Sequence, residues 1–224
     1  MTIGAYKAII FDLDGTLIDS AADVGDAVNR VLSRYGFLEH PGAAYYRFMG
    51  DGVVELMRRA LPEKARSSER VQAGVQAFFR EYEGCWHHHS RPYPGVPELL
   101  DGLSERGVRL SVLSNKPHAF TTAFVERFFP EWTFAAVFGQ REGVPRKPDP
   151  AAALEIADGM GISPAAVLFL GDTPTDMRTA RAAGMFSVGA CWGFRSPSEL
   201  SAGGAESLIR HPMELLRFFD DPIP

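Results

Sequence analysis

The chain has few or none of several sequence features that would each indicate a particular class of protein. Only two of its 224 residues are cysteines, Cys85 and Cys191, so it has no disulfide framework of the kind found in small secreted domains. No apolar run approaches the roughly 20 residues that a helix needs to span a bilayer. Residues 1–7 lack the charge, apolar block and cleavage site of a secretory leader. We therefore expect a cytoplasmic protein that has no membrane partner.

Positively charged residues are also fewer than negatively charged ones. The chain has 23 Lys and Arg residues against 28 Asp and Glu residues, which gives a formal net charge of -5. An extended nucleic-acid surface needs a basic patch, so we expect no nucleic-acid partner. An anionic small molecule would depend instead on local positive charge, from Lys147 or from a bound metal ion. Hydrophobic residues make up 46% of the chain, which is typical of a globular core.

The most informative segment is residues 8–17, with the sequence AIIFDLDGTL. Its apolar first half predicts a buried strand, and Gly15 ends the pattern. Asp12 and Asp14 lie two residues apart, so they share one face of an extended segment. Two carboxylates this close repel each other unless a cation or a shared proton lies between them. The pair indicates a metal site or a nucleophile beside a general acid, although an acidic turn that merely ends a strand would use the same residues.

Similar polar residues follow later in the chain. A second apolar strand is predicted to end at Ser114 and Asn115, and a third at Asp172, with Asp176 four residues further on. Lys147 lies between them in a proline-rich loop. Ligands bind beyond the carboxyl ends of the strands in an open parallel sheet, so one fold would bring these residues to one site. Taken singly, each also has a structural explanation, such as a helix cap for Ser114 or a solvated surface position for Lys147.

The apolar pattern divides the chain into two kinds of segment. Residues 20–90 show helical spacing without strand-like alternation, and Ser20 is expected to cap the first helix. From residue 91 onward, predicted strands alternate with helices, which is typical of a doubly wound parallel sheet. We therefore predict an α/β fold with a Rossmann-like catalytic core, formed by residues 1–19 and 91–224. Residues 20–90 would be an inserted α-helical domain.

In chain order, the motifs DxDGT, S-N, K-P and GDxxxD resemble those of the haloacid dehalogenase superfamily of phosphohydrolases. The resemblance spans essentially the whole chain and implies that Asp12 attacks phosphorus and forms an aspartyl-phosphate. It implies that Asp14 is the general acid and then the general base. Ser114 and Asn115 would hydrogen-bond the phosphate oxygens, and Lys147 would neutralise the nucleophile and the phosphoryl group.

The resemblance also implies a bound metal ion, most simply Mg²⁺, which prefers oxygen ligands. Its ligands would be the carboxylates of Asp12 and Asp172 and the backbone carbonyl of Asp14. Asp176 is expected to hold the metal's water or Lys147 rather than bind the metal directly. In this family the helical insert is a mobile cap seated over the active site.

Within the superfamily, the chain is similar to the phosphoglycolate phosphatases at residues 92–96, 171–177 and 191–196. The sequence RFMGDG at residues 47–52 also resembles the cap loop that reaches over the substrate in that group. Arg47 is therefore a candidate to pair with a substrate carboxylate, and an ordinary helix-surface position is the alternative. The resemblance implies a Mg²⁺-dependent phosphatase for a small-molecule phosphate ester, with 2-phosphoglycolate as the expected substrate. The residues leave open whether it acts as a monomer or a homodimer.

Several alternatives share this fold. A phosphomutase of the β-phosphoglucomutase type usually carries an acidic residue directly before the metal aspartate, and Gly171 at that position favours the hydrolase. A haloalkanoate dehalogenase lacks the second acid of the DxD motif, so Asp14 argues against it. A non-catalytic phosphate-binding module would be expected to have lost one of the acids or the lysine, and none is missing.

Overall fold

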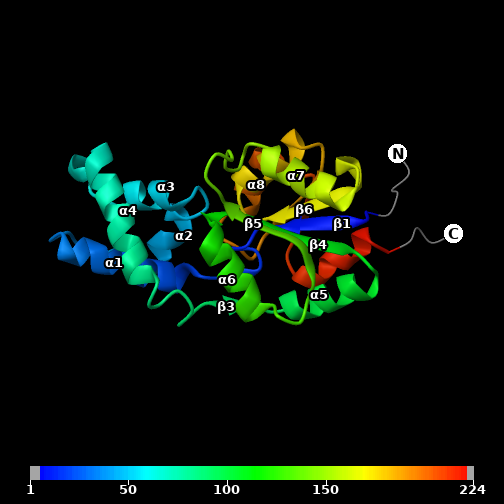
Figure 1. Ribbon diagram of the computed structural model, residues 1–224, viewed down its shortest axis with the longest axis horizontal. Coiled ribbons are helices and arrows are strands. Elements are labelled where there is room, and N and C mark those ends of the chain that lie inside the picture. Colours follow the sequence, from blue (N-terminus) through cyan, green and yellow to red (C-terminus); the bar gives the residue numbers. More distant parts are fainter. Residues whose placement is uncertain (1–5, 221–224) are drawn as a thin grey trace.

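A parallel sheet forms the centre of the larger part of the protein, in a computed structural model that describes residues 6–220. Its strand order is β5-β4-β1-β6-β7-β8, and neighbouring strands pair in parallel (Figure 1). The strands are β1 (Ala8–Phe11), β4 (Arg109–Pro117), β5 (Phe134–Gln140), β6 (Val167–Gly171), β7 (Phe186–Ala190) and β8 (Ser207–Ile209). Most of the amino-terminal segment compared above with secretory leaders lies outside the described residues.

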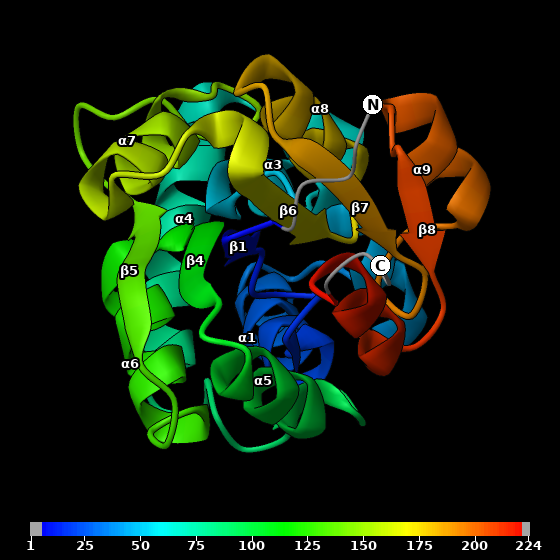
Figure 2. The same cartoon turned by 90° about the vertical axis from the view of Figure 1, so that its right-hand side faces the viewer.

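Helices cover both faces of this sheet. They are α5 (Val96–Glu105), α6 (His118–Phe128), α7 (Ala151–Met160), α8 (Pro174–Ala182) and, beside the last strands, α9 (Pro197–Gly203). Figure 2 shows α7 and α8 on one side of the sheet and α5 and α6 on the other. Side chains of β1 alternate between these two cores: Ala8 and Ile10 pack with α7 and α8, and Ile9 and Phe11 pack with α5 and α6. Burial on both faces explains the uninterrupted apolar run of this strand, and the predicted α/β fold class is confirmed.

A group of helices lies between two short strands that pair in antiparallel fashion. In chain order the segment consists of β2 (Ile18–Asp19), α1 (Ala21–Arg34), α2 (Tyr45–Phe48), α3 (Val53–Ala60), α4 (Ser68–Tyr82) and β3 (Arg91–Pro92). Figure 1 shows these helices gathered at one end of the molecule, beyond the carboxyl end of β1. No helix within residues 6–220 combines the length and the apolarity needed to cross a bilayer.

The start of α1 differs from the prediction made for Ser20. Ser20 occupies the N-cap position, but its side chain accepts no capping hydrogen bond. Its hydroxyl donates to the Asp14 carboxylate, while Asp19 accepts a hydrogen bond of 3.3 Å from the backbone N–H of Ala21. A hydrogen bond to a charged carboxylate is stronger than one between neutral groups, which explains why Ser20 turns toward Asp14.

Asp23 joins the two ends of the helical segment. Its buried carboxylate accepts hydrogen bonds from the backbone N–H groups of His89 at 2.9 Å and Ser90 at 2.8 Å, and from the Ser90 hydroxyl at 2.7 Å. Because Asp23→Ala leaves these donors buried without an acceptor, we expect the free energy of unfolding to fall by about 3 kcal/mol. Urea denaturation measures this change. The exposed Asp26→Ala on the same helix is the control, and equal losses in both variants would contradict the prediction.

Candidate active site

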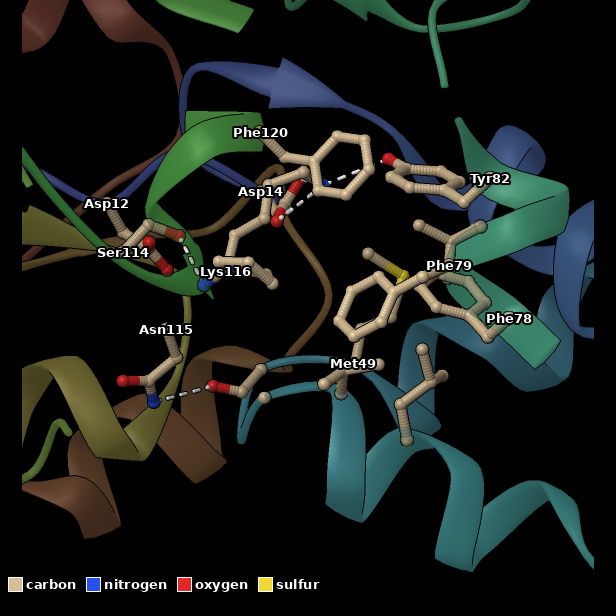
Figure 3. A pocket seen from close by; sticks show the side chains of 16 residues that line it. Asp12, Asp14, Met49, Phe78, Phe79, Tyr82, Ser114, Asn115, Lys116 and Phe120 are labelled. Atoms are coloured by element: carbon tan, nitrogen blue, oxygen red, sulfur yellow. Dashed lines mark hydrogen bonds and ion pairs between the residues drawn. The ribbon is translucent and has the colours of Figure 1, made fainter. Parts of the chain in front are cut away.

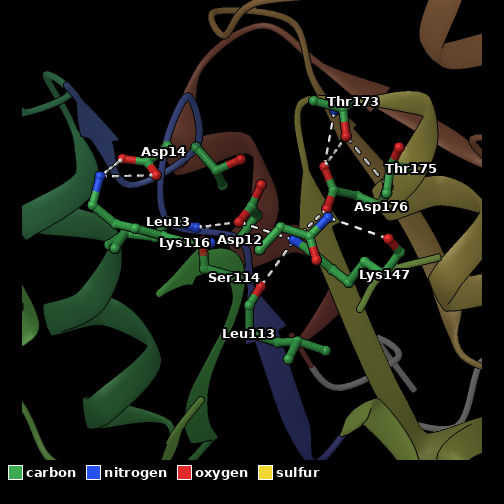
Figure 4. A network of polar contacts seen from close by, with 12 residues as sticks. Asp12, Leu13, Asp14, Leu113, Ser114, Lys116, Lys147, Thr173, Thr175 and Asp176 are labelled. Carbon is green, nitrogen blue, oxygen red and sulfur yellow. Dashed lines mark hydrogen bonds and ion pairs between the residues drawn. The ribbon is translucent and has the colours of Figure 1, made fainter. Parts of the chain in front are cut away.

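Three neighbouring strands bring the predicted residues together. Asp12 follows β1 directly, Ser114 lies near the end of β4, and Asp172 follows β6. Because β1 lies between β4 and β6 and the three strands are parallel, their carboxyl ends meet at one edge of the sheet. Lys147 reaches the same edge from the loop before α7 (Figure 4).

Three buried acids share a small volume at this edge. Carboxylate oxygens of Asp12, Asp172 and Asp176 lie within 4.8 Å of one another. The Nζ atom of Lys147 lies 2.9 Å from Asp12 Oδ1 and 2.6 Å from Asp176 Oδ1. One ammonium group does not balance three carboxylates, so the ionised cluster carries an excess of negative charge.

Burial and nearby negative charge both disfavour the ionised forms of Asp12 and Asp172. Burial, and then the charge of Asp176, raises the pKa of Asp12 to about 7, although Lys147 opposes the shift. Burial and the charges of Asp12 and Asp176 raise the pKa of Asp172 well above its usual range. A bound divalent cation favours the ionised form of its ligands, and carboxylate oxygens suit Mg²⁺. The cluster therefore fits the metal ion that the sequence predicts.

The backbone packs directly against Asp172. The Thr16 hydroxyl donates to one carboxylate oxygen at 3.0 Å, and the backbone N–H of Phe194 donates to the other at 2.8 Å. Gly15 has a φ of 88°, and a Cβ atom there would lie 2.2 Å from Asp172 Oδ2. A Cβ atom at Gly193 would lie 2.3 Å from Asp172 Cβ. Glycine at both positions is what leaves room for the carboxylate.

Both carboxylate oxygens of Asp176 are hydrogen-bonded within the protein. Oδ1 accepts from Lys147, and Oδ2 accepts from the backbone N–H and the hydroxyl of Thr173 at 3.0 and 2.6 Å. These contacts with Thr173 form a capping box at the start of α8. Lys147 also donates to the backbone carbonyl of Leu113 at 2.9 Å. Asp176 is therefore in direct contact with Lys147, and its expected role in holding that lysine or the metal's water stays a prediction.

Ser114 and Asn115 differ in what they offer a phosphate group. Ser114 Oγ accepts a hydrogen bond of 3.2 Å from the backbone N–H of Lys116, and the hydroxyl proton has no acceptor among the described residues. Asn115 Nδ2 donates to the backbone carbonyls of Gly50 and Lys147, both at 3.2 Å. The contact with Gly50 links the insert to the core. The hydrogen bond expected between Asn115 and the phosphate oxygens stays a prediction.

Asp14 stands apart from the acid cluster and pairs with Lys116 (Figure 4). The Nζ atom of Lys116 lies 2.9 and 3.1 Å from the two Asp14 oxygens, and 3.0 Å from the hydroxyl oxygen of Tyr82 on α4. The sequence reasoning gave Lys116 no role. A cation directly after Ser114 and Asn115 was the available signal, but the contact with Tyr82 depends on where α4 lies.

Arg47 lies outside this site. Its side chain is exposed on α2, and it is not among the described residues that line the pocket. A different arginine holds the neighbouring loop, because Arg195 donates to the backbone carbonyls of Tyr46 and Met49, the latter at 2.8 Å. The pairing of Arg47 with a substrate carboxylate therefore stays a prediction without a contact behind it.

A pocket lies between the end of the sheet and the helical insert (Figure 3). The space inside it that admits water-sized molecules is about 60 Å³, so the site is narrow. Its polar floor consists of Asp12, Asp14, Ser114, Asn115 and Lys116. Its wall is mostly apolar and includes Met49, Leu56, Phe78, Phe79, Tyr82 and Phe120. The pocket suits a small molecule whose polar end reaches Asp12.

Comparison with known proteins leads to the same family. The family model described as haloacid dehalogenase-like hydrolase matches residues 9–190. Phosphoglycolate phosphatases from Pseudomonas putida and Rhodospirillum rubrum are 32% and 34% identical to this chain. Those matches cover 96% and 88% of this chain and 80% and 84% of the two relatives. A solved structure of a predicted phosphoglycolate phosphatase from Haemophilus somnus has a TM-score of 0.88 and 26% identity, over 98% of this chain and 100% of that one.

These matches agree with the order of the motifs and with their positions at the strand ends. The family resemblance predicted from the sequence is thereby confirmed. The chain belongs to the haloacid dehalogenase-like hydrolases and is a phosphoric monoester hydrolase of the phosphoglycolate phosphatase-like type.

Proposed function

We propose that the protein hydrolyses a small phosphate monoester with Mg²⁺, through an aspartyl-phosphate on Asp12. The observation that carries this proposal is the buried cluster of three acids around Lys147, of which Asp12 also lines the floor of the pocket between the sheet and the insert. Residues 20–90 serve as a cap over the leaving-group side of the pocket. Residues 1–19 and 91–224 serve as the catalytic core, with β2 and β3 at the two connections.

Asp12 is the nucleophile in this proposal. One of its oxygens attacks phosphorus while the bond from phosphorus to the leaving oxygen breaks. The leaving oxygen keeps the electron pair of that bond and takes a proton from Asp14. Lys147 and the Ser114 hydroxyl stabilise the negative charge on the phosphoryl oxygens. Water then attacks the phosphorus of the aspartyl-phosphate and gives its proton to Asp14, which releases phosphate and restores Asp12.

The acid cluster would hold the Mg²⁺ ion. Its ligands would be the carboxylates of Asp12 and Asp172 and the backbone carbonyl of Asp14. When bound, the ion neutralises the acids and draws negative charge from the phosphoryl oxygens. The hydrogen bonds that Thr16 and Phe194 donate to Asp172 keep this carboxylate oriented.

Mg²⁺ should stabilise the protein more at about pH 8 than at about pH 5.5. Without metal, the pKa of Asp12 rises from its ordinary value of 3.8 to about 7 in the folded protein. Between these values the folded state holds a proton that the unfolded chain has released, so metal-free stability falls as pH rises through this window. Above about pH 7 Asp12 is ionised and ready to bind Mg²⁺. Thermal unfolding with Mg²⁺ or EDTA at both pH values measures this difference, and equal shifts would contradict it.

The proposed substrate is 2-phosphoglycolate, and the names of the relatives support it. The phosphomutase alternative is less well supported. A Cβ atom at Gly171 would lie 2.3 Å from Asp176 Cβ, which leaves no room for the acidic residue that such mutases usually carry at this position. The complete set of acids and Lys147 likewise argues against a binding module that has lost catalysis.

Phosphate release from a panel of small esters tests this proposal. The panel includes 2-phosphoglycolate and p-nitrophenyl phosphate, each with Mg²⁺ or with EDTA. We expect release that depends on Mg²⁺ and is fastest for 2-phosphoglycolate. Release from other esters alone would keep the chemistry and discard the substrate, and no release from any ester would favour a mutase or a binding role.

A further inference from the structure

Lys116 is the only cation among the described residues that line the pocket. Its side chain is 5% exposed, and its ammonium group contacts the Asp14 carboxylate and the Tyr82 hydroxyl. Its Nζ atom also lies 4.4 Å from the centre of the Phe124 ring. Burial alone would lower the pKa of Lys116, but the Asp14 carboxylate outweighs burial and raises it. Lys116 therefore stays charged as long as an anion lies beside it.

The surroundings of Lys116 favour a second anion beside it. Its ammonium group is buried beside Tyr82 and Phe124, and Asp14 is its only anionic partner among the described residues. A buried charge gains strongly from a nearby opposite charge. An anionic group of a substrate in the pocket would therefore be attracted to Lys116.

The part of a substrate that comes near Lys116 follows from the position of Asp14. In the proposed reaction Asp14 contacts the leaving oxygen, and Lys116 Nζ lies 2.9 Å from Asp14 Oδ1. Atoms one or two bonds beyond the leaving oxygen therefore come close to Lys116. The wall around this end of the pocket is apolar, with Met49, Phe79 and Phe120 among its residues (Figure 3).

We propose that Lys116 recognises a carboxylate attached next to the leaving oxygen. The inference rests on the proposed phosphatase function and deepens it. It selects the phosphate monoesters of short hydroxy acids, a class that includes 2-phosphoglycolate. It also assigns to Lys116, on β4, the carboxylate contact that the sequence suggested for Arg47 on α2.

A pair of esters that differ only in this charge tests the proposal. 2-Phosphoglycolate is compared with its amide, carbamoylmethyl phosphate, by kcat/KM at saturating Mg²⁺. We expect the wild-type protein to prefer the carboxylate by at least about 100-fold, because a site built for a charged partner rejects an analogue without it. In Lys116→Met the preference should fall below about 10-fold. Exposed Lys64→Met is the matched control and should keep the wild-type preference.

A second variant keeps the test decisive. Lys116→Gln retains hydrogen-bonding groups near Asp14 and Tyr82 without the charge, so it replaces Lys116→Met if that variant does not fold. An equal loss on both esters, with the preference unchanged, would mean that Lys116 only positions Asp14 and would overturn the proposal. A wild-type protein without a preference for the carboxylate would overturn it as well.

Binding separates this inference from the proposed function. Asp12→Asn lacks the nucleophile, so calorimetry can compare its affinity for the two esters, with and without Lys116→Met, in the presence of Mg²⁺. If the wild-type protein hydrolyses neither ester, the phosphatase proposal fails, yet a carboxylate preference in binding that Lys116→Met removes would still support the role of Lys116. Equal affinity for both esters in the Asp12→Asn protein would overturn that role.

Discussion

Asp12→Asn should lower phosphate release by at least about 10⁴-fold while the protein stays folded. An asparagine amide does not attack phosphorus, and no other described acid lies in the pocket except Asp14, which pairs with Lys116. The fold should survive because the variant removes one negative charge from a crowded, buried cluster. Burial already raises the pKa of Asp12 to about 7, so at about pH 8 the ionised form opposes folding in the metal-free protein.

Phosphate release with Mg²⁺ and thermal unfolding in EDTA, both at about pH 8, measure these two effects. The unfolding temperature of Asp12→Asn should equal or exceed that of the wild-type protein. Asp158→Asn, an exposed change of the same kind on α7, is the control and should keep full activity. Residual turnover above about one hundredth of the wild-type rate would show that another group is the nucleophile.

Lys147→Met should destabilise the metal-free protein by about 3 to 5 kcal/mol at about pH 8 and lower activity by at least about 10³-fold. The change leaves the Asp12 and Asp176 carboxylates buried without their cation. Removing the positive charge raises the pKa of Asp12 further, so the folded state gains a proton that the unfolded chain lacks. The loss of stability should therefore shrink as pH falls toward about 5.5, where Asp12 is protonated.

Urea denaturation in EDTA at the two pH values measures this dependence. Lys64→Met, which changes an exposed lysine to the same residue, is the control and should move stability by less than about 0.5 kcal/mol. An equal loss at both pH values would indicate lost packing rather than lost charge. That outcome would contradict the role of Lys147 as the cation that balances these acids.

The convergence of the acids was predictable from the sequence for a physical reason. Apolar runs that end in a polar residue mark the carboxyl ends of buried parallel strands, and such ends meet at one edge of the sheet. Asp12 and Asp172 follow β1 and β6 in this way, and these strands are neighbours. The chain order of the motifs supplied the rest, including Lys147 from a loop.

Contacts between the insert and the core were not predictable in the same way. Arg146 donates to the backbone carbonyl of Asp51 at 3.1 Å, and the Thr175 hydroxyl donates to its carboxylate at 2.9 Å. Such contacts, like that of Lys116 with Tyr82, join residues far apart in the chain and leave no periodic pattern. The short elements α2, β2, β3 and β8 were missed because two to four residues are too few to show a period. Arg47 shows the same limit, since a loop resemblance does not fix the direction of a side chain.

Trapping the phosphorylated enzyme tests the central claim most directly. Asp14→Ala is mixed with p-nitrophenyl phosphate, whose leaving group needs little protonation, so the first step proceeds while the second lacks its base. The quenched protein is reduced with borohydride, which converts a phosphorylated aspartate to homoserine, and its peptides are analysed by mass spectrometry. Homoserine at position 12 is the predicted result. Release of p-nitrophenol without homoserine at this position, or with homoserine at another acid, would contradict the account.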